Sequence, residues 1–391
     1  MDAADFAAVL AEVRRFVRER VVPFEAEIDE KDEVPEEIRE AAKKMGLYGF
    51  ALPTEYGGLG LSMHEEVQLM FELGYTTPAL RSMFGTNNGI AGHVLIVGGT
   101  PEQKEQWLPK LASGEVTASF ALTEPDAGSD PSSLTTIARR DENGGWVING
   151  AKRYITNAPI ADVFMVFART DKDAPKTRGI STFLVPAGSP GLTVAPRDHK
   201  LGPLGAWTAD VGFSDVRVPA SALVGGEEGG LNRGFRTAMG CLAHGRVHIS
   251  ALCVGMAERL VDESVEYARG RVQSGRPIGA YQLVQGLIAD SQMDYYVGRA
   301  TVLEAARNFD SGQDTKIGPS CTKYFTSEMV SRVADRAVQI HGGAGYMRGV
   351  PVERFFRDAR LFQLYEGTTQ IQQVIIAKAL LGDAARETMS V

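Results

Sequence analysis

Three glycine-punctuated stretches of the chain hold polar side chains in unusual density. They read LTEPDAGSD from Leu122 to Asp130, QIHGGAGY from Gln339 to Tyr346, and LFQLYEGTTQIQQVII from Leu361 to Ile376. Glycines let a backbone approach a ligand closely. A glutamate such as Glu366 can serve as a general base when burial brings its pKa nearer to the working pH. Together the stretches are typical of a site where a carboxylate works beside a closely held ligand.

Ordinary structural roles also account for each stretch taken alone. Ile371, Val374 and Ile375 have a helical period, so Glu366 would lie where that helix begins and would complement its dipole. The Pro, Asp, Gly and Ser of the first stretch are common turn residues. The Gly-x-Gly of the second is only a fragment of a dinucleotide fingerprint, and it follows a helical pattern. Both interpretations of each stretch stay open at this point.

Composition limits the class of protein. The 391 residues suffice for two or three domains, and 41 Lys and Arg against 49 Asp and Glu give a net charge of −8. That charge opposes nucleic-acid binding, because phosphate contacts dominate its affinity. No apolar run approaches ~18 residues, so we expect no transmembrane helix. The arginine-containing N-terminus carries Asp2, Asp5 and Glu12 and continues as an amphipathic pattern, which we interpret as part of the fold rather than a transit peptide.

The cysteines and histidines predict neither a disulfide framework nor a metal site. Cys241, Cys253 and Cys321 are odd in number and form no C-x-x-C pair, which favours a reducing, cytoplasmic location. His244 and His248 have a metal-like spacing, but no carboxylate partner of the H-E-x-x-H kind accompanies them. We therefore expect packed or surface histidines and no metal.

The pattern of secondary structure predicts three domains in an α+β fold. Residues 1–115 have helical patterns, including one from Pro78 to Val97. Residues 116–230 contain seven short runs rich in Val, Ile, Phe and Thr, with a hairpin around Asn143-Gly144, and predict a β-sandwich or β-barrel. Residues 231–391 have helical stripes long enough for an up-and-down bundle.

In this order and with this domain pattern, the three stretches resemble the acyl-CoA dehydrogenase family over essentially the whole chain. TEPDAGSD resembles its first signature, and QIHGGAGY followed by PVERFFRDAR (Pro351 to Arg360) resembles its second. LYEGTTQIQ is similar to the catalytic segment of short- and medium-chain members. The resemblance implies an N-terminal α-domain, a central β-domain and a C-terminal four-helix bundle, assembled as a homotetramer with one FAD per subunit.

The reaction implied by this resemblance is α,β-dehydrogenation of an acyl-CoA thioester to the trans-2-enoyl-CoA, as in fatty-acid β-oxidation. Glu366 is implied as the base that removes the α proton, while the β hydrogen leaves as hydride to the flavin and the electrons pass to an electron-transfer flavoprotein. In relatives the backbone N–H of the catalytic glutamate and a flavin ribityl hydroxyl bind the thioester oxygen. Burial beside the acyl chain is expected to raise the pKa of Glu366.

Matched positions also imply the binding residues. Arg271 and Gln273 match a segment that reaches a neighbouring subunit's FAD diphosphate, where a guanidinium suits phosphate oxygens. The cofactor-binding residues implied are Phe120, Leu122, Thr123, Ser129, Tyr154, Ile155, Thr156, Arg271, Gln273, Gln282, Gln339, Gly342, Gly343, Thr368 and Gln370. The substrate-binding residues implied are Met83, Phe84, Thr86, Ser129, Arg246, Tyr365 and Gly367.

The sequence departs from the family pattern at several positions. Ser274 replaces an aromatic residue that stacks on the partner's flavin, Gly349 replaces an acidic residue, and Ala243 replaces a frequent Asp. Gly245 occupies the helix position where some branched-chain and long-chain members place their base. Since glycine cannot serve, Glu366 is the only matched base.

The sequence leaves two alternative functions open. An acyl-CoA oxidase would use the same residues and let oxygen reach the reduced flavin, although the chain is short for that class. A non-catalytic relative that binds acyl-CoA or nucleic acid is opposed by the acidic net charge and by the intact Glu366 segment. The acyl group itself is left open by the sequence.

Overall fold

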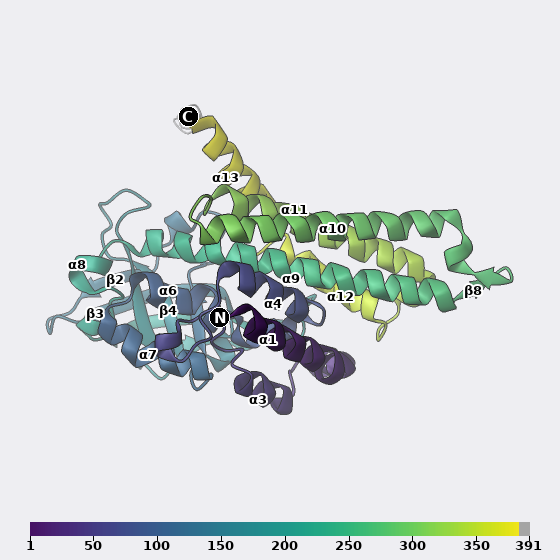
Figure 1. Ribbon diagram of the computed structural model, residues 1–391. Coiled ribbons are helices and arrows are strands. Elements are labelled where there is room, and N and C mark those ends of the chain that lie inside the picture. The colour runs from purple at the N-terminus through teal and green to yellow at the C-terminus, as the bar shows by residue number, and fades with distance from the viewer. Residues whose placement is uncertain (383–391) are drawn as a thin grey trace.

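The structure is a computed structural model that describes residues 1–382 of the chain. An N-terminal set of helices, a curled β-sheet and a C-terminal set of long helices follow one another along the chain (Figure 1). The predicted fold class is therefore confirmed. The domain boundaries after residues 115 and 230 stay predictions, although no described helix or strand crosses either position.

Seven helices make up the N-terminal part. A π-helical turn at Val17–Val21 and a 3-10 turn containing Pro23 interrupt the first amphipathic pattern. The pattern from Pro78 to Val97 divides at Gly89 into two helices. The elements are α1 (Ala3–Phe16), α2 (Glu25–Lys31), α3 (Glu36–Lys44), α4 (Met63–Gly74), α5 (Pro78–Asn88), α6 (Ile90–Gly98) and α7 (Pro101–Ser113).

The central strands form one seven-stranded sheet in the order β1-β4-β2-β3-β7-β6, with β5 paired to the other edge of β4. β1 pairs with β4 in parallel, and both are buried along their length because helices and loops cover them. The expected hairpin is present as β2 paired with β3, and Gly144 in its loop has a φ of +81°. The strands are β1 (Ala118–Ala121), β2 (Ile137–Arg140), β3 (Trp146–Thr156), β4 (Val163–Arg169), β5 (Ile180–Pro186), β6 (Leu192–Val194) and β7 (Thr208–Val218).

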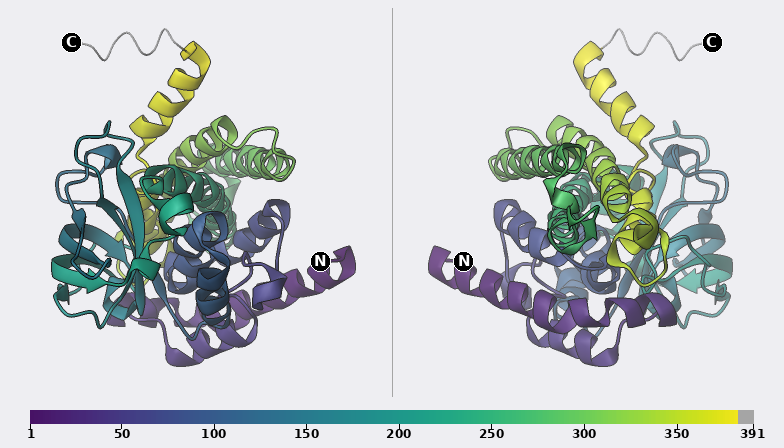
Figure 2. Two further views of the ribbon diagram at one scale, coloured as in Figure 1. Left: turned by 90° about the vertical axis from the view of Figure 1, so that its left-hand side faces the viewer. Right: turned by 90° about the vertical axis from the view of Figure 1, so that its right-hand side faces the viewer.

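Long helices dominate the C-terminal part. α9 contacts both α11 and α4, so it joins the bundle to the N-terminal helices. A short hairpin, β8 (Val272–Gln273) and β9 (Arg276–Pro277), lies at the end of the bundle away from the sheet (Figure 1). Figure 2 shows α13 projecting away from the body of the molecule. The helices are α8 (Gly226–Gly230), α9 (Gly234–Gly270), α10 (Gln282–Asp310), α11 (Ile317–His341), α12 (Pro351–Phe362) and α13 (Thr369–Leu381).

Burial follows the same organisation. One apolar core runs through α1, α4, α9, α11 and α12, and two further clusters cover the two faces of the sheet. Among residues 1–382, no helix is both long enough and apolar enough to cross a membrane.

Candidate active site

A cavity of about 700 Å³ lies where the sheet, α5, α9 and the segment between α12 and α13 meet. Ligand pockets in proteins are commonly of this size. The cavity brings together residues that are far apart in the sequence. Of the predicted site residues, it is lined by Thr86, Phe120, Leu122, Thr123, Ser129, Tyr154, Ile155, Thr156, Arg246, Tyr365, Glu366 and Gly367.

Glu366 lies in a tight turn that other side chains hold. Its φ is +53° and that of Gly367 is +92°, and a left-handed conformation costs a residue with a side chain about 1 kcal/mol. The Glu366 carbonyl accepts hydrogen bonds from Gln372 at 3.2 Å and from Arg246 at 3.4 Å. Lys323 donates to the Gly367 carbonyl at 2.7 Å. The turn therefore stays in its strained conformation because buried donors fix its carbonyl groups.

The position of Glu366, before the N-cap of α13, argues against a role as an acidic first-turn residue that complements the helix dipole. Helix α13 begins at Thr369, and the Thr368 hydroxyl accepts the N–H of Ile371. The carboxylate of Glu366 instead lies at the cavity wall. Its Oε2 atom is buried and has no hydrogen-bond partner among the described residues, and the same residues offer no acceptor to its backbone N–H. Neither group is held by another described residue.

The surroundings of Glu366 raise the pKa of its carboxyl group. Burial raises the pKa of Glu366 above its ordinary value, while the positive charges of Arg81, Arg246 and Lys323 partly oppose the shift. A buried carboxylate with a raised pKa is a better proton acceptor than an exposed one.

Gly245 on α9 supplies the room for this carboxylate. A Cβ at position 245 would lie 2.3 Å from Glu366 Oε2 and 3.1 Å from a methyl carbon of Ile90. The carboxylate of Glu366 therefore fills the space that any side chain at 245 would need.

The first signature is fixed by a buried ion pair. Glu124 accepts from Lys152 of β3 at 2.8 Å and from the backbone N–H groups of Thr135 and Thr136. Burial by itself would raise the pKa of Glu124, but Lys152 and these hydrogen bonds outweigh it and lower the pKa to about 2. Burial lowers the pKa of Lys152 to about 8 in spite of Glu124. Lys152 also donates to the Leu122 carbonyl at 3.1 Å, so the pair sets the position of the cavity wall.

Several predicted residues do not line the cavity. Met83 and Phe84 are buried in the helical core. Arg271 and Gln273 lie at the hairpin end of the bundle (Figure 1). The other residues that do not line the cavity are Gln282, Gln339, Gly342, Gly343, Thr368 and Gln370. The cofactor roles of this group stay predictions.

Two residues of the site were missed in the sequence. Lys323 is fully buried on α11, and burial lowers its pKa to about 8 although Cys253 and Glu366 oppose the shift. Arg81 is 8% exposed and lines the cavity. Charged residues on helical patterns are usually solvated, so neither gave a signal of its own.

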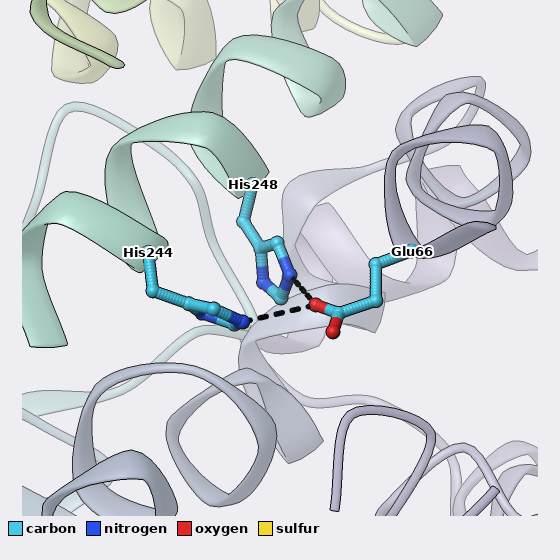
Figure 3. A group of neighbouring side chains, drawn as sticks. All are labelled: Glu66, His244 and His248. Atoms are coloured by element: carbon cyan, nitrogen blue, oxygen red, sulfur yellow. Dashed lines mark hydrogen bonds and ion pairs between the residues drawn. The ribbon is translucent and has the colours of Figure 1, made fainter. Parts of the chain in front are cut away.

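The two histidines are packed in the core, as expected, with a carboxylate from a distant helix (Figure 3). Glu66 of α4 contacts His244 Nε2 at 3.1 Å and forms a short contact with His248. The His93 ring stacks on His244, with centroids 4.4 Å apart. Burial, and the neighbouring His244, lower the pKa of His248 to about 4. Each of Glu66, His244 and His248 offers an atom that could bind a metal, and both histidine contacts are made to the same oxygen, Glu66 Oε2.

A cavity of this size, with a carboxylate in its wall and a curled sheet on one side, defines an enzyme-like ligand site, and comparisons with known proteins agree. Acyl-CoA dehydrogenase family models match residues 4–115 (N-terminal domain), 119–216 (middle domain) and 232–381 (C-terminal domain). An acyl-CoA dehydrogenase of Bacillus subtilis is 38% identical over 95% of this chain and 96% of its own length.

Two further relatives extend this comparison. The caffeyl-CoA reductase-Etf complex subunit CarC of Acetobacterium woodii is 36% identical over 91% of this chain and 92% of its own. The structure of butyryl-CoA dehydrogenase from Megasphaera elsdenii matches with a TM-score of 0.92 at 32% identity, over 97% of this chain and 100% of that one. The chain belongs to the acyl-CoA dehydrogenase family and is an oxidoreductase of that family.

Proposed function

We propose that this protein catalyses the FAD-dependent α,β-dehydrogenation of an acyl-CoA thioester, with Glu366 as the base. The observation that carries the proposal is that Glu366 lines the cavity while its buried Oε2 atom has no hydrogen-bond partner among residues 1–382. A carboxylate in this state can accept a proton without first breaking a hydrogen bond.

FAD is the cofactor that the family assignment supports. The residues lining the cavity from β1, β3 and the first signature would hold its ring system, with Tyr154, Ile155 and Thr156 along one wall. The 60% exposure of Tyr154, a large side chain at the cavity, fits a position that a ligand covers. When bound, FAD supplies the acceptor for the hydride from the β carbon.

The protein's own groups would prepare the α carbon for deprotonation. The backbone N–H of Glu366 would donate to the thioester oxygen and favour the enolate-like transition state. Lys323 and Gln372 keep that N–H in place because both bind the Gly367 carbonyl. Burial of Glu366 raises its pKa towards the range useful for a base.

The proposed partners are an electron-transfer flavoprotein and further copies of this chain. The name of CarC places that relative in an Etf complex, which supports such an electron carrier here. Leu283 and Tyr296 on α10 are 88% and 71% exposed, which supports their burial in a homotetramer. In that assembly Arg271, Gln273 and Gln282 would reach a neighbouring subunit's FAD. We place the reaction in cytoplasmic fatty-acid β-oxidation.

The test is the substitution Glu366→Gln. The variant should keep its FAD but lose bleaching of the flavin by acyl-CoA in the absence of oxygen, because the amide cannot take the α proton. The wild-type rate of bleaching should fall as the pH is lowered through the raised pKa of Glu366, because protonation removes the base. Fast bleaching in the variant would show that Glu366 is not the base. Reoxidation by air at a rate matching turnover would instead indicate an oxidase.

A further inference from the structure

Arg81 is a buried cation at the cavity without a protein partner. It comes from α5, is 8% exposed and lines the same cavity as Glu366. Its Nε and Nη2 atoms are buried and form no hydrogen bond, and it has no ion pair within residues 1–382. A buried charge is costly unless it is paired, so this guanidinium is expected to have a partner when the site is filled.

Two glycines near Arg81 leave room for its guanidinium. A Cβ at Gly85, one turn further along α5, would lie 2.5 Å from Arg81 Nε and 2.6 Å from its Cζ. A Cβ at Gly89 would lie 3.4 Å from Nη2. The Arg81 side chain therefore lies along a groove that two glycines leave on the helix.

The neighbouring cations already have acceptors. Arg246 donates to the Glu366 carbonyl and Lys323 to the Gly367 carbonyl. Lys200, which also lines the cavity, donates to the Ala206 carbonyl. Arg81 differs from all three, since its donors point to no protein oxygen.

The position of Arg81 relative to Glu366 can be compared through their surroundings on α9. Gly245 faces the Glu366 carboxylate, while His248 lies beside Gly89, the same glycine that faces Arg81 Nη2. The two α9 residues are three apart, which is ~4.5 Å along a helix axis. The Glu366 carboxylate and the surroundings of the guanidinium therefore meet α9 at positions about one turn apart, and the charge of Arg81 is near enough to oppose the burial that raises the pKa of Glu366. A short acyl chain could extend from one group to the other.

We propose that Arg81 binds a carboxylate at the far end of the acyl chain, so that the substrate is a short acyl-CoA that ends in a carboxylate. The guanidinium fork matches a carboxylate with two parallel hydrogen bonds. Ile90, Met239 and Leu242 give the same cavity apolar lining for the carbon chain. This inference rests on the proposed dehydrogenation and adds the substrate class to it.

The experiment compares acyl-CoAs of equal carbon number that end in a carboxylate or in a methyl group. The pairs are succinyl with butyryl, glutaryl with pentanoyl, and adipyl with hexanoyl. In the best pair, the wild-type holoenzyme should have a kcat/KM at least ~100-fold higher for the carboxylated compound, the scale of a buried charge pair. Equal or better use of the methyl-ended compound in every pair overturns the inference and leaves the proposed function intact. Failure of all six, with bleaching by a longer or branched acyl-CoA, also overturns the inference alone. Failure of every acyl-CoA tested to bleach the flavin overturns the proposed function itself.

Variants separate substrate binding from an effect on Glu366. Arg81→Met should raise KM for the carboxylated compound ~100-fold and abolish the preference, and Arg81→Lys should retain part of it. Gly85→Ala should weaken the preference by displacing the guanidinium. Arg20→Met, a change at an exposed arginine, is the matched control and should keep the preference.

A measurement without turnover completes the test. In a Glu366→Gln background, calorimetry should give ~100-fold weaker binding of the carboxylated compound after Arg81→Met, with little change for its methyl-ended pair. If Arg81→Met instead lowers kcat equally for both compounds, shifts the pH profile and leaves both affinities unchanged, Arg81 acts only on the base and the inference is wrong.

Discussion

The position of the Glu366 carboxylate depends both on the space left by a neighbouring glycine and on the hydrogen bonds that hold its turn. Gly245 leaves the space that the carboxylate fills, and a left-handed turn at 366 and 367 aims it there. Lys323 and Gln372 bind the carbonyl of Gly367 and prevent the turn from relaxing. At the residue scale, the proposed role of Glu366 as a base depends on Gly245, on the strained backbone at 366 and on the buried donors that hold the turn.

Gly245→Ala tests this arrangement. The added methyl would lie 2.3 Å from Glu366 Oε2, so the carboxylate must move. A displacement of ~1 Å from the reacting geometry costs ~100-fold in rate. We expect anaerobic bleaching of the flavin by acyl-CoA to slow by that factor, with FAD content unchanged.

The matched control is Gly240→Ala on the same helix, where a Cβ meets no atom within 4 Å. It should bleach at the wild-type rate. If both alanine variants react equally fast, the space at 245 has no part in placing the base.

At the scale of elements, a buried pair joins the first signature to β3. Glu124 and Lys152 are 3% and 0% exposed and 2.8 Å apart. The same lysine donates to the Leu122 carbonyl, so β3 also holds the Leu122 part of the cavity wall in place. Pro125, Asp126 and Gly128 of the TEPDAGSD loop are exposed, as turn residues usually are, while this pair anchors the loop at Glu124.

Lys152→Met should therefore destabilise the protein and its cofactor site together. Removing one partner of a buried pair leaves an uncompensated charge and costs ~3–5 kcal/mol. We expect a lower melting temperature and faster loss of FAD, measured by thermal melting and by release of flavin fluorescence. Lys176→Met is the control, because the Lys176 side chain is 75% exposed and 4.0 Å from Asp130, and such surface pairs contribute ~0–1 kcal/mol. Equal losses in the two variants would contradict an anchoring role for Lys152.

At the scale of the whole molecule, buried charges join the two ends of the chain. Glu25 of α2 binds Arg354 of α12 at 2.6 Å and Arg259 of α9 at 3.3 Å. Asp29 binds Arg357 at 3.0 Å. These pairs fix α12, and with it the catalytic segment that follows, against the N-terminal helices.

Asp358 in the same region should make stability depend on pH. It is 1% exposed, neither carboxylate oxygen has a hydrogen-bond partner among the described residues, and burial raises its pKa to about 7. A native pKa above the unfolded value means that stability is lost as pH rises from ~4 to ~7, because only the unfolded chain ionises freely there. Asp358→Asn should raise the melting temperature more at pH 8 than at pH 5.

The control for that measurement is Asp335→Asn, a change at an exposed aspartate. Thermal melts of both variants at the two pH values give the comparison. A gain from Asp358→Asn that is the same at pH 5 and pH 8 would show that ionisation of Asp358 is not the cause.

Local patterns were enough to predict most of the helices and strands and their order along the chain. The β2–β3 hairpin, the proline-initiated helices and the order of helical, β and helical parts all follow from turn residues, caps and periodicity, which act over a few neighbouring residues. The resemblance carried by three short stretches led to the family and to Glu366. Local patterns could not place the break at Gly89, where one helical pattern became α5 and α6.

Tertiary structure decided everything that depends on contacts between distant residues. The carboxylate partner of His244 and His248 comes from Glu66, 182 positions away from His248. Lys323 and Arg81 look like solvated helix residues in the sequence, yet both are buried at the site. The physical reason is that burial and the pairing of charges are set by which helices pack together. The sequence therefore led to Glu366 as the proposed base, and only the fold determined what surrounds that residue and that Arg81 is buried at the same cavity.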